Sequence, residues 1–96
     1  TAKMMLNEII KNRPDLKAVY GREGISSLRN ENEIGVHSVR GGSIVGEHKV
    51  IFAGDDEIIE ITHIANSKKI FANSALKLAK KLAGMPNGYY SIKDFL

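Results

Sequence analysis

Two stretches of the chain repeat hydrophobic residues at the spacing of an amphipathic helix. In residues 2–12 the main apolar side chains fall within an arc of about 140°, and polar side chains occupy the other side. In residues 70–83 a broad apolar arc opposes three lysines, where their charges are solvated. Pro14 ends the first helix, because the residue before a proline avoids the α-helical region. The pattern therefore predicts two helices, one near each end of the chain.

The ends of the second helix carry recognisable signals. Asn66 or Ser67 is the expected N-cap, and Gly84 stands at the position of a C′ glycine, with Pro86 shortly after it. Lys68 extrapolates to the apolar side of the helix, near an N-terminus whose dipole disfavours a cation. Two explanations fit: Lys68 precedes the first turn, or it meets an anion.

Between the helices the hydrophobic pattern changes to that of β-strands. Strands are predicted at residues 33–40, 44–53 and 57–64. Gly41-Gly42 joins the first two, and Gly54-Asp55-Asp56 joins the last two. Connections this short predict antiparallel neighbours.

The three predicted strands are apolar on both faces, unlike a sheet that is wet on one side. Two helices can cover only one of these faces. The prediction is an α+β domain with a mostly antiparallel sheet, or a mixed one as the alternative. Two main helices cover one face, and the other face serves self-association, because large exposed apolar patches usually mark interfaces.

The remaining segments read as loops. Residues 13–32 are polar and irregular, and Gly21 and Gly24 predict special backbone angles in a surface loop. The alternative for this loop is a close approach to a ligand or a neighbouring subunit. It lacks the frame of a phosphate-binding loop. At the C-terminus, Phe95 and Leu96 are expected to pack onto the core.

Composition narrows the class of protein. The 96 residues are 43% hydrophobic and 26% charged, as in one ordinary globular domain. The net charge is +3, but the basic residues are scattered and only 6% of residues are aromatic, which argues against nucleic-acid binding. No run is long and apolar enough for a membrane span. The absence of cysteine excludes disulfides and zinc–thiolate sites and fits a cytoplasmic protein.

The residues alone do not assemble an active site. His37, His48 and His63 lie one on each predicted strand, so a metal cluster is one hypothesis. No HxH or HExxH spacing supports it, and histidines that form hydrogen bonds within the sheet are the favoured alternative. Lys49 and Glu60 are expected to form a cross-strand ion pair.

Several motifs nevertheless resemble one family. The sequence RGGSIVGEHKVIF spans Arg40–Phe52, EITHIA spans Glu60–Ala65, and FANSA spans Phe71–Ala75. Together with the YGREG loop at residues 20–24, they resemble the C-terminal domain of dihydrodipicolinate reductase, an enzyme family of bacterial lysine and diaminopimelate biosynthesis. The resemblance covers essentially the whole chain.

The resemblance implies a function that composition does not. Residues 1–96 would be the substrate-binding and tetramerisation domain, with the Rossmann-type nucleotide-binding domain of the full enzyme absent from this chain. The full enzyme would use NADH or NADPH to reduce a cyclic dicarboxylate, as a cytoplasmic homotetramer assembled through its sheets. The chain alone is expected to bind no cofactor and to be inactive. A stand-alone oligomerisation or ligand-binding module is the alternative.

The resemblance also implies site residues. The family's motif HHxxKxDxPSGTA carries its catalytic histidine and lysine upstream of this chain, so no catalytic residue and no metal ligand is expected here. Its closing Thr-Ala matches Thr1-Ala2, which makes Thr1 a substrate-binding residue at a helix N-terminus. Lys68 and Phe71 would lie near the cofactor, and Lys68 stands where arginine is common, keeping the charge without the bidentate fork. Ser74 replaces a frequent glycine without an evident reason.

Overall fold

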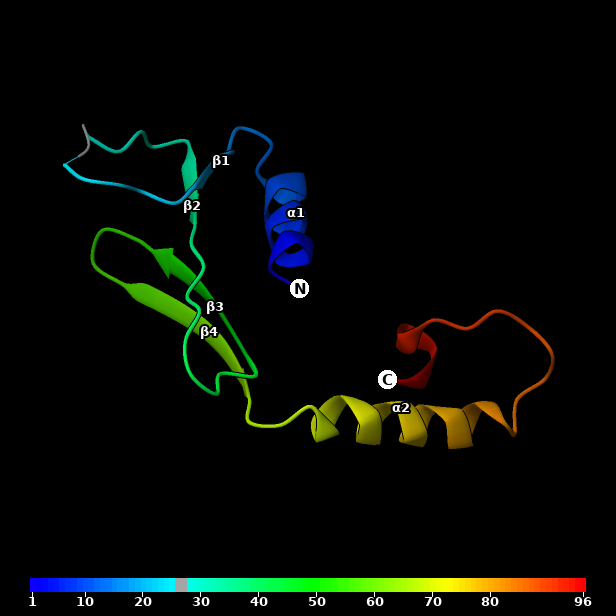
Figure 1. The fold of residues 1–96 in the computed structure, drawn as a ribbon. Helices are drawn as coiled ribbons and strands as arrows, with labels where there is room; N and C mark the ends of the chain where they lie inside the picture. The colour runs from blue at the N-terminus through cyan, green and yellow to red at the C-terminus, as the bar shows by residue number, and fades with distance from the viewer. Residues whose placement is uncertain (26–27) are drawn as a thin grey trace.

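The structure, a computed structural model, describes residues 1–25 and 28–96 (Figure 1). In chain order its elements are α1 (Ala2–Asn12), β1 (Lys17–Tyr20), β2 (Glu33–Val36), β3 (Gly46–Ala53), β4 (Ile58–Ala65), α2 (Lys69–Leu82) and the 3-10 helix η1 (Ile92–Phe95). The α+β class is confirmed. The single mostly antiparallel sheet is not, because the described strands form two separate pairs, one parallel and one antiparallel.

Both predicted helices are present within a residue of their expected bounds. The first, α1, ends where the backbone N–H of Arg13 donates to the carbonyl of Ile9 at 2.9 Å, just before Pro14. Its apolar arc contains Leu6, which is only 6% exposed. The bounds predicted for this helix from local periodicity and Pro14 are therefore confirmed.

The ends of α2 differ from the prediction in detail. Its N-cap is Lys68 rather than Asn66 or Ser67, although the Oγ of Ser67 accepts a hydrogen bond from the backbone N–H of Lys69 at 3.2 Å. Lys68 therefore precedes the first helical turn, as the first explanation expects, and contact with an anion stays a prediction. Gly84 follows the C-cap but does not adopt a left-handed conformation. The helix instead closes with a tighter bond from Gly84 N–H to the carbonyl of Lys81, at 3.3 Å.

The first sheet corrects the prediction of an irregular loop at residues 13–32. Strand β1 lies within that segment and pairs in parallel with β2, with Lys17 opposite Glu33 and Tyr20 opposite Val36. The predicted strand 33–40 is accordingly shortened to Glu33–Val36. The described parts of the connection between these strands are residues 21–25 and 28–32, and Gly21 and Gly24 have φ angles of 70° and 62°. The special backbone angles predicted for this loop are therefore confirmed, while Ser26 and Ser27 lie outside the described residues.

The second sheet is an eight-residue antiparallel ribbon of β3 and β4. Its register runs from Gly46 opposite Ala65 to Ala53 opposite Ile58. The N–H of Gly54 donates to the carbonyl of Glu57 at 2.8 Å and closes the turn. Both strands and this turn were predicted, because short-range alternation and a Gly-Asp-Asp turn are local signals.

The strand β2 does not continue this ribbon, although a short Gly41-Gly42 connection predicted that it would. Only Gly42 has a positive φ, of 44°, and the N–H of Ile44 donates to the carbonyl of Gly41 at 3.2 Å within a local turn. A two-residue hairpin needs a positive φ at its first central residue, a condition that Gly41 does not meet. The segment between β2 and β3 is therefore a long connector between two sheets.

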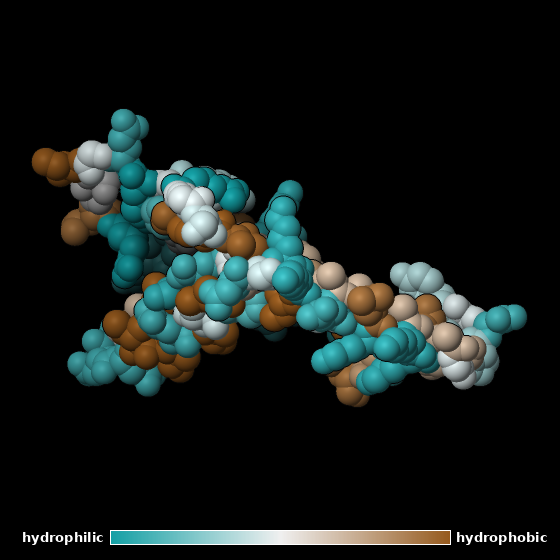
Figure 2. Space-filling model, turned by 60° about the horizontal axis from the view of Figure 1, so that its bottom comes forward, coloured by the Kyte–Doolittle hydropathy of each residue, from teal (hydrophilic) through white to brown (hydrophobic). Residues whose placement is uncertain are grey.

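The packing is open. Among the described residues only Leu6 and Ala65 are buried hydrophobic side chains. The radius of gyration is 18.1 Å, against about 12–13 Å for a compact domain of this length. Exposed hydrophobic side chains cover both faces of the ribbon, and Figure 2 shows them gathered over the part of the molecule that contains β3 and β4. The chain therefore leaves most of its apolar surface outside its own core.

Two expectations about packing are wrong. The helices do not jointly cover one face of a sheet, since α2 extends away from both sheets (Figure 1). Leu96 does not pack onto the core and is 98% exposed. Phe95 instead contacts the ring of Tyr90, with ring centres 6.2 Å apart, so the C-terminal segment packs locally.

Candidate functional site

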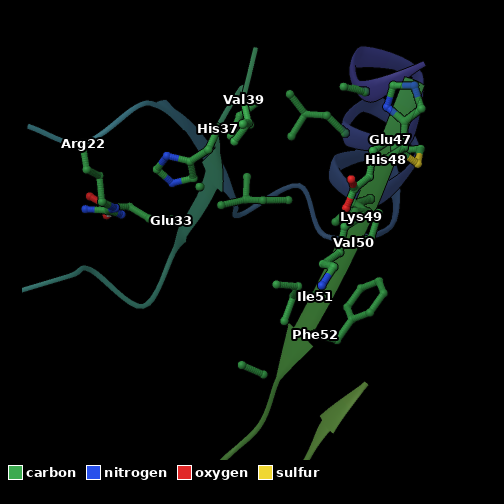
Figure 3. A pocket seen from close by; sticks show the side chains of 18 of the residues that line it. Arg22, Glu33, His37, Val39, Glu47, His48, Lys49, Val50, Ile51 and Phe52 are labelled. Atoms are coloured by element: carbon green, nitrogen blue, oxygen red, sulfur yellow. The ribbon is translucent and has the colours of Figure 1, made fainter. Parts of the chain in front are cut away.

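A hollow of about 1440 Å³ lies between α1, β2, the connector and β3 (Figure 3). Its walls are mainly apolar on the side of α1, where Met5, Leu6 and Ile9 face it. Charged and polar side chains enter from the segments around β2 and from β3. This combination of apolar walls with a few polar groups suits a ligand or another protein segment.

One hydrogen-bonded polar group at this hollow joins the loop that follows β1 to the start of β2. Nη2 of Arg22 donates to Oε2 of Glu33 at 2.8 Å, and Nδ2 of Asn30 donates to Oε1 of the same carboxylate at 3.0 Å. These hydrogen bonds, that from Arg22 first, lower the pKa of Glu33 below its ordinary value. Figure 3 shows the two charged side chains pointing toward one another.

This cluster was missed from the sequence. Arg22 and Glu33 are eleven residues apart in sequence. Glu33 lies opposite Lys17 and Arg22 follows Tyr20 at the other end of the pair, so the contact requires the Arg22 side chain to reach back along its own sheet. The loop that carries Arg22 is therefore held to its own sheet and is exposed at its tip, while its approach to a ligand or a neighbouring subunit stays a prediction. The signal that could have found the cluster is a strand at Lys17–Tyr20, and four residues in a polar segment give little alternation to detect.

The three histidines separate into a pair and a single residue. His48 and His63 lie directly opposite one another on β3 and β4, and His37 follows β2 at the hollow. Across residues 1–25 and 28–96, no group of three histidine, aspartate or glutamate side chains is arranged to hold a metal ion. The hypothesis of a cluster built from all three strands is therefore wrong for the described chain.

The favoured alternative, histidines bonded within the sheet, gains no support either. The side-chain hydrogen bonds among the described residues include none from an imidazole. The expected cross-strand ion pair is confirmed, with Nζ of Lys49 3.5 Å from Oε2 of Glu60. The two residues are diagonal neighbours rather than direct partners.

Thr1 is the N-cap of α1. Its carbonyl accepts a hydrogen bond from the N–H of Met5 at 3.0 Å, while its side chain makes no capping hydrogen bond. The first turn of the helix contains no acidic residue. The backbone N–H groups of this turn and the helix dipole therefore favour an anion at this end.

Lys68 and Phe71 stand together at the start of α2. The carbonyl of Lys68 accepts a hydrogen bond from the N–H of Phe71 at 3.1 Å. The first turn has no acidic residue, and the ring of Phe71 is 57% exposed. A cation and an exposed ring at a helix N-terminus suit a phosphate and a flat ring, respectively.

The structure does not bring these three residues to one place. Thr1 marks the N-terminus, and the start of α2 lies apart from it in Figure 1. None of the three lines the hollow. The predicted substrate and cofactor residues thus remain two separate helix starts within this chain.

Among the residues that the structure describes, no helix has the length and apolar character needed to cross a membrane.

Comparison with known proteins identifies the class. The family model described as "Dihydrodipicolinate reductase, C-terminus" matches residues 1–96. Proteins from the Staphylococcus aureus strains JH9, Newman and N315, each named 4-hydroxy-tetrahydrodipicolinate reductase, are 46% identical to the chain over 94 residues. The match covers 98% of this chain and 39% of each of these relatives. The class is thus that of a C-terminal region found in reductases.

The family model that matches all 96 residues of this chain shows which family within that class it belongs to. The chain belongs to the dihydrodipicolinate reductase C-terminus family. The resemblance drawn from the motifs at Arg40–Phe52, Glu60–Ala65 and Phe71–Ala75 is confirmed.

Proposed function

We propose that this chain is the substrate-binding and assembly domain of a 4-hydroxy-tetrahydrodipicolinate reductase in lysine and diaminopimelate biosynthesis. The observation that carries the proposal is the family match over residues 1–96. The domain works together with a nucleotide-binding domain, because the chain spans 39% of the length of the curated relatives. The cytoplasm is the compartment in which such biosynthesis takes place.

Thr1 binds a carboxylate of the substrate in this proposal. The substrate is a dicarboxylate, and the first turn of α1 offers N–H groups and a hydroxyl that no described side chain occupies. These donors orient the substrate and hold its charge. The acid and base for proton transfer belong, in this proposal, to the upstream part of the family's catalytic motif.

Lys68 and Phe71 face the cofactor, which is NADH or NADPH. The cofactor, when bound, supplies the hydride. The exposed side chain of Lys68 balances phosphate charge, and the half-exposed ring of Phe71 covers an apolar surface. The preference between the two dinucleotides is set elsewhere, since residues that choose between them belong to the Rossmann-type domain.

Self-association completes the proposed domain. Both faces of the β3–β4 ribbon expose isoleucines and Phe52, and a surface of this kind is stabilised by burial against a second copy. A homotetramer formed through the sheets accounts for this surface. Apolar surface that one chain leaves open thereby becomes the core of the assembly.

A chimera tests the proposal. Residues 1–96 replace the matching region of the S. aureus reductase, and reduction of 4-hydroxy-tetrahydrodipicolinate is followed by loss of NADH or NADPH absorbance. The chimera is expected to turn over substrate, and the 96-residue chain alone is not.

Thr1→Val in the chimera is expected to raise KM for the substrate about tenfold or more, because a charge-assisted hydrogen bond is lost. Lys68→Met is expected to raise KM for the cofactor instead.

The result also separates this function from a stand-alone module. A folded, assembled chimera without reductase activity contradicts the proposal and favours an oligomerisation or ligand-binding module. Turnover by the 96-residue chain alone contradicts the proposal that the reaction also requires a nucleotide-binding domain.

A further inference from the structure

The β3–β4 ribbon places two histidines opposite one another. His48 is the register partner of His63. Residues directly opposite in an antiparallel pair project from the same face, with Cβ atoms about 4.5–5.5 Å apart. At this spacing two imidazole rings can turn one nitrogen each toward a common point.

The face that carries the pair offers nitrogen donors alone. Its neighbours along the two strands are Val50 and Ile61 on one side and Gly46 and Ala65 on the other. The side chains of α1 that line the nearby hollow are apolar as well. Carboxylates, the oxygen ligands that hard cations such as Mg²⁺ require, are missing from this face of the ribbon.

The nearest carboxylates of the ribbon project from its other face. Glu47 is opposite Ile64, and Glu60 is opposite Ile51, so both alternate away from the histidines. Glu60 is also engaged by Lys49, with Nζ and Oε2 3.5 Å apart. The charge pair and the imidazole pair are thus separated by the plane of the ribbon.

We propose that His48 and His63 form a two-imidazole site for a divalent transition-metal ion of the Zn²⁺ class. Neutral imidazole is a preferred ligand of Zn²⁺, Cu²⁺ and Ni²⁺. In the single chain His48 is half-buried and His63 is exposed, so water reaches the ion there and completes its coordination. The site involves none of Thr1, Lys68 and Phe71, but it shares its face of the ribbon with apolar side chains proposed for self-association.

Metal binding at this pair holds the ribbon in register. A slip of one residue moves one imidazole to the opposite face and breaks the site. An ion that binds only the correctly paired ribbon therefore stabilises it by mass action.

Zinc titration of the 96-residue chain tests the proposal. Calorimetry with ZnCl₂ is expected to show one ion bound per chain, and with MgCl₂ to show none. His48→Gln and His63→Gln are each expected to weaken zinc binding by at least about tenfold. His37→Gln is the matched control, since it removes an imidazole outside the ribbon, and it is expected to leave binding unchanged.

A second variant distinguishes loss of the metal site from loss of the folded state. The exchange Thr62→His with His63→Thr keeps three histidines and the composition of β4 but moves one imidazole to the other face. Circular dichroism establishes that each variant is folded, and zinc is expected to raise the Tm of the unchanged chain but not that of the exchange variant. Zinc binding by the unchanged chain no tighter than by the His48→Gln variant overturns the proposal, as does equal loss of binding in His37→Gln.

Discussion

The parallel pair β1–β2 and the antiparallel ribbon β3–β4 differ in length, in the sequence distance between partners and in what holds them together. The first has four residues per strand, and hydrogen bonds from Arg22 and Asn30 to Glu33 tie the loop between its strands to β2. The second has eight residues per strand, a tight turn and isoleucines on both faces. Polar contacts thus complete the short sheet within the chain, while the long one leaves its apolar surface for a partner.

The largest effect is expected from a charge on the ribbon. Ile61 is 62% exposed and lies on the face that carries the histidine pair. Ile61→Lys is expected to weaken the proposed self-association about 100-fold, since burying one isoleucine contributes about 2–3 kcal/mol. Sedimentation equilibrium measures the effect, and Ile61→Val is the control that keeps the face apolar. Unchanged association of Ile61→Lys would place the assembly surface elsewhere.

The connector between the two sheets is expected to show the next largest effect. Gly42 has a φ of 44°, whereas Gly41 does not have a positive φ, and a Cβ at either position meets no atom within 4 Å. Gly42→Ala is therefore expected to lower the free energy of unfolding by about 1 kcal/mol, through backbone strain alone. Gly41→Ala is the matched control with little expected change, and chemical denaturation compares the two. Equal effects would refute the strain argument.

Acid is expected to weaken the short sheet selectively. The hydrogen bonds from Arg22 and Asn30 lower the pKa of Glu33 below its ordinary 4.5. Because the Glu33 carboxyl group has a lower pKa in the folded chain than in the unfolded chain, its ionised form stabilises the sheet at pH values above the unfolded pKa. This stabilisation is lost as the pH falls through the folded pKa. Between about pH 5 and pH 3, protection of the β1–β2 amides should therefore fall severalfold relative to that of the β3–β4 amides.

Hydrogen exchange with NMR detection measures that ratio. Glu33→Gln serves as the control, because a side chain that does not titrate removes the pH step from β1–β2. A ratio that stays constant with pH in the unchanged chain would show that the carboxylate does not hold the short sheet together.

The smallest effect is expected from the ion pair on the ribbon. Lys49 and Glu60 are 41% and 47% exposed, so water and salt screen their attraction. Glu60→Gln is expected to change the free energy of unfolding by less than about 0.5 kcal/mol. A loss above 1 kcal/mol in thermal denaturation would mean that charge also stabilises the long sheet.

The contrast between the two sheets also explains what the sequence could predict. The helices, the ribbon and the Gly54 turn rest on contacts between residues close in sequence, and each was predicted nearly to its bounds. The pairing of Lys17 with Glu33 spans sixteen positions and leaves no periodic signal, so β1 and the Arg22–Glu33 contact were missed. The antiparallel connection predicted at Gly41-Gly42 was wrong, because two glycines permit a hairpin turn without requiring one.

The candidate site was predictable only through the family. Thr1, Lys68 and Phe71 carry no local pattern that distinguishes them from other residues at helix starts, and their assignment depends on the motif that each one matches. The histidine pair is different, because correct strand boundaries and the register together place His48 opposite His63. The strand boundaries were predictable from the alternating pattern, whereas the register depends on the turn that β3 and β4 share.

The position of α2 has a consequence for how the chain behaves on dilution. This 14-residue helix extends away from both sheets, and Ile70, Phe71, Leu76 and Leu82 remain exposed along it. A helix of this length is marginal in water unless its apolar side is covered. Its helicity should therefore follow protein concentration, so that far-UV circular dichroism of this chain reports assembly as well as folding.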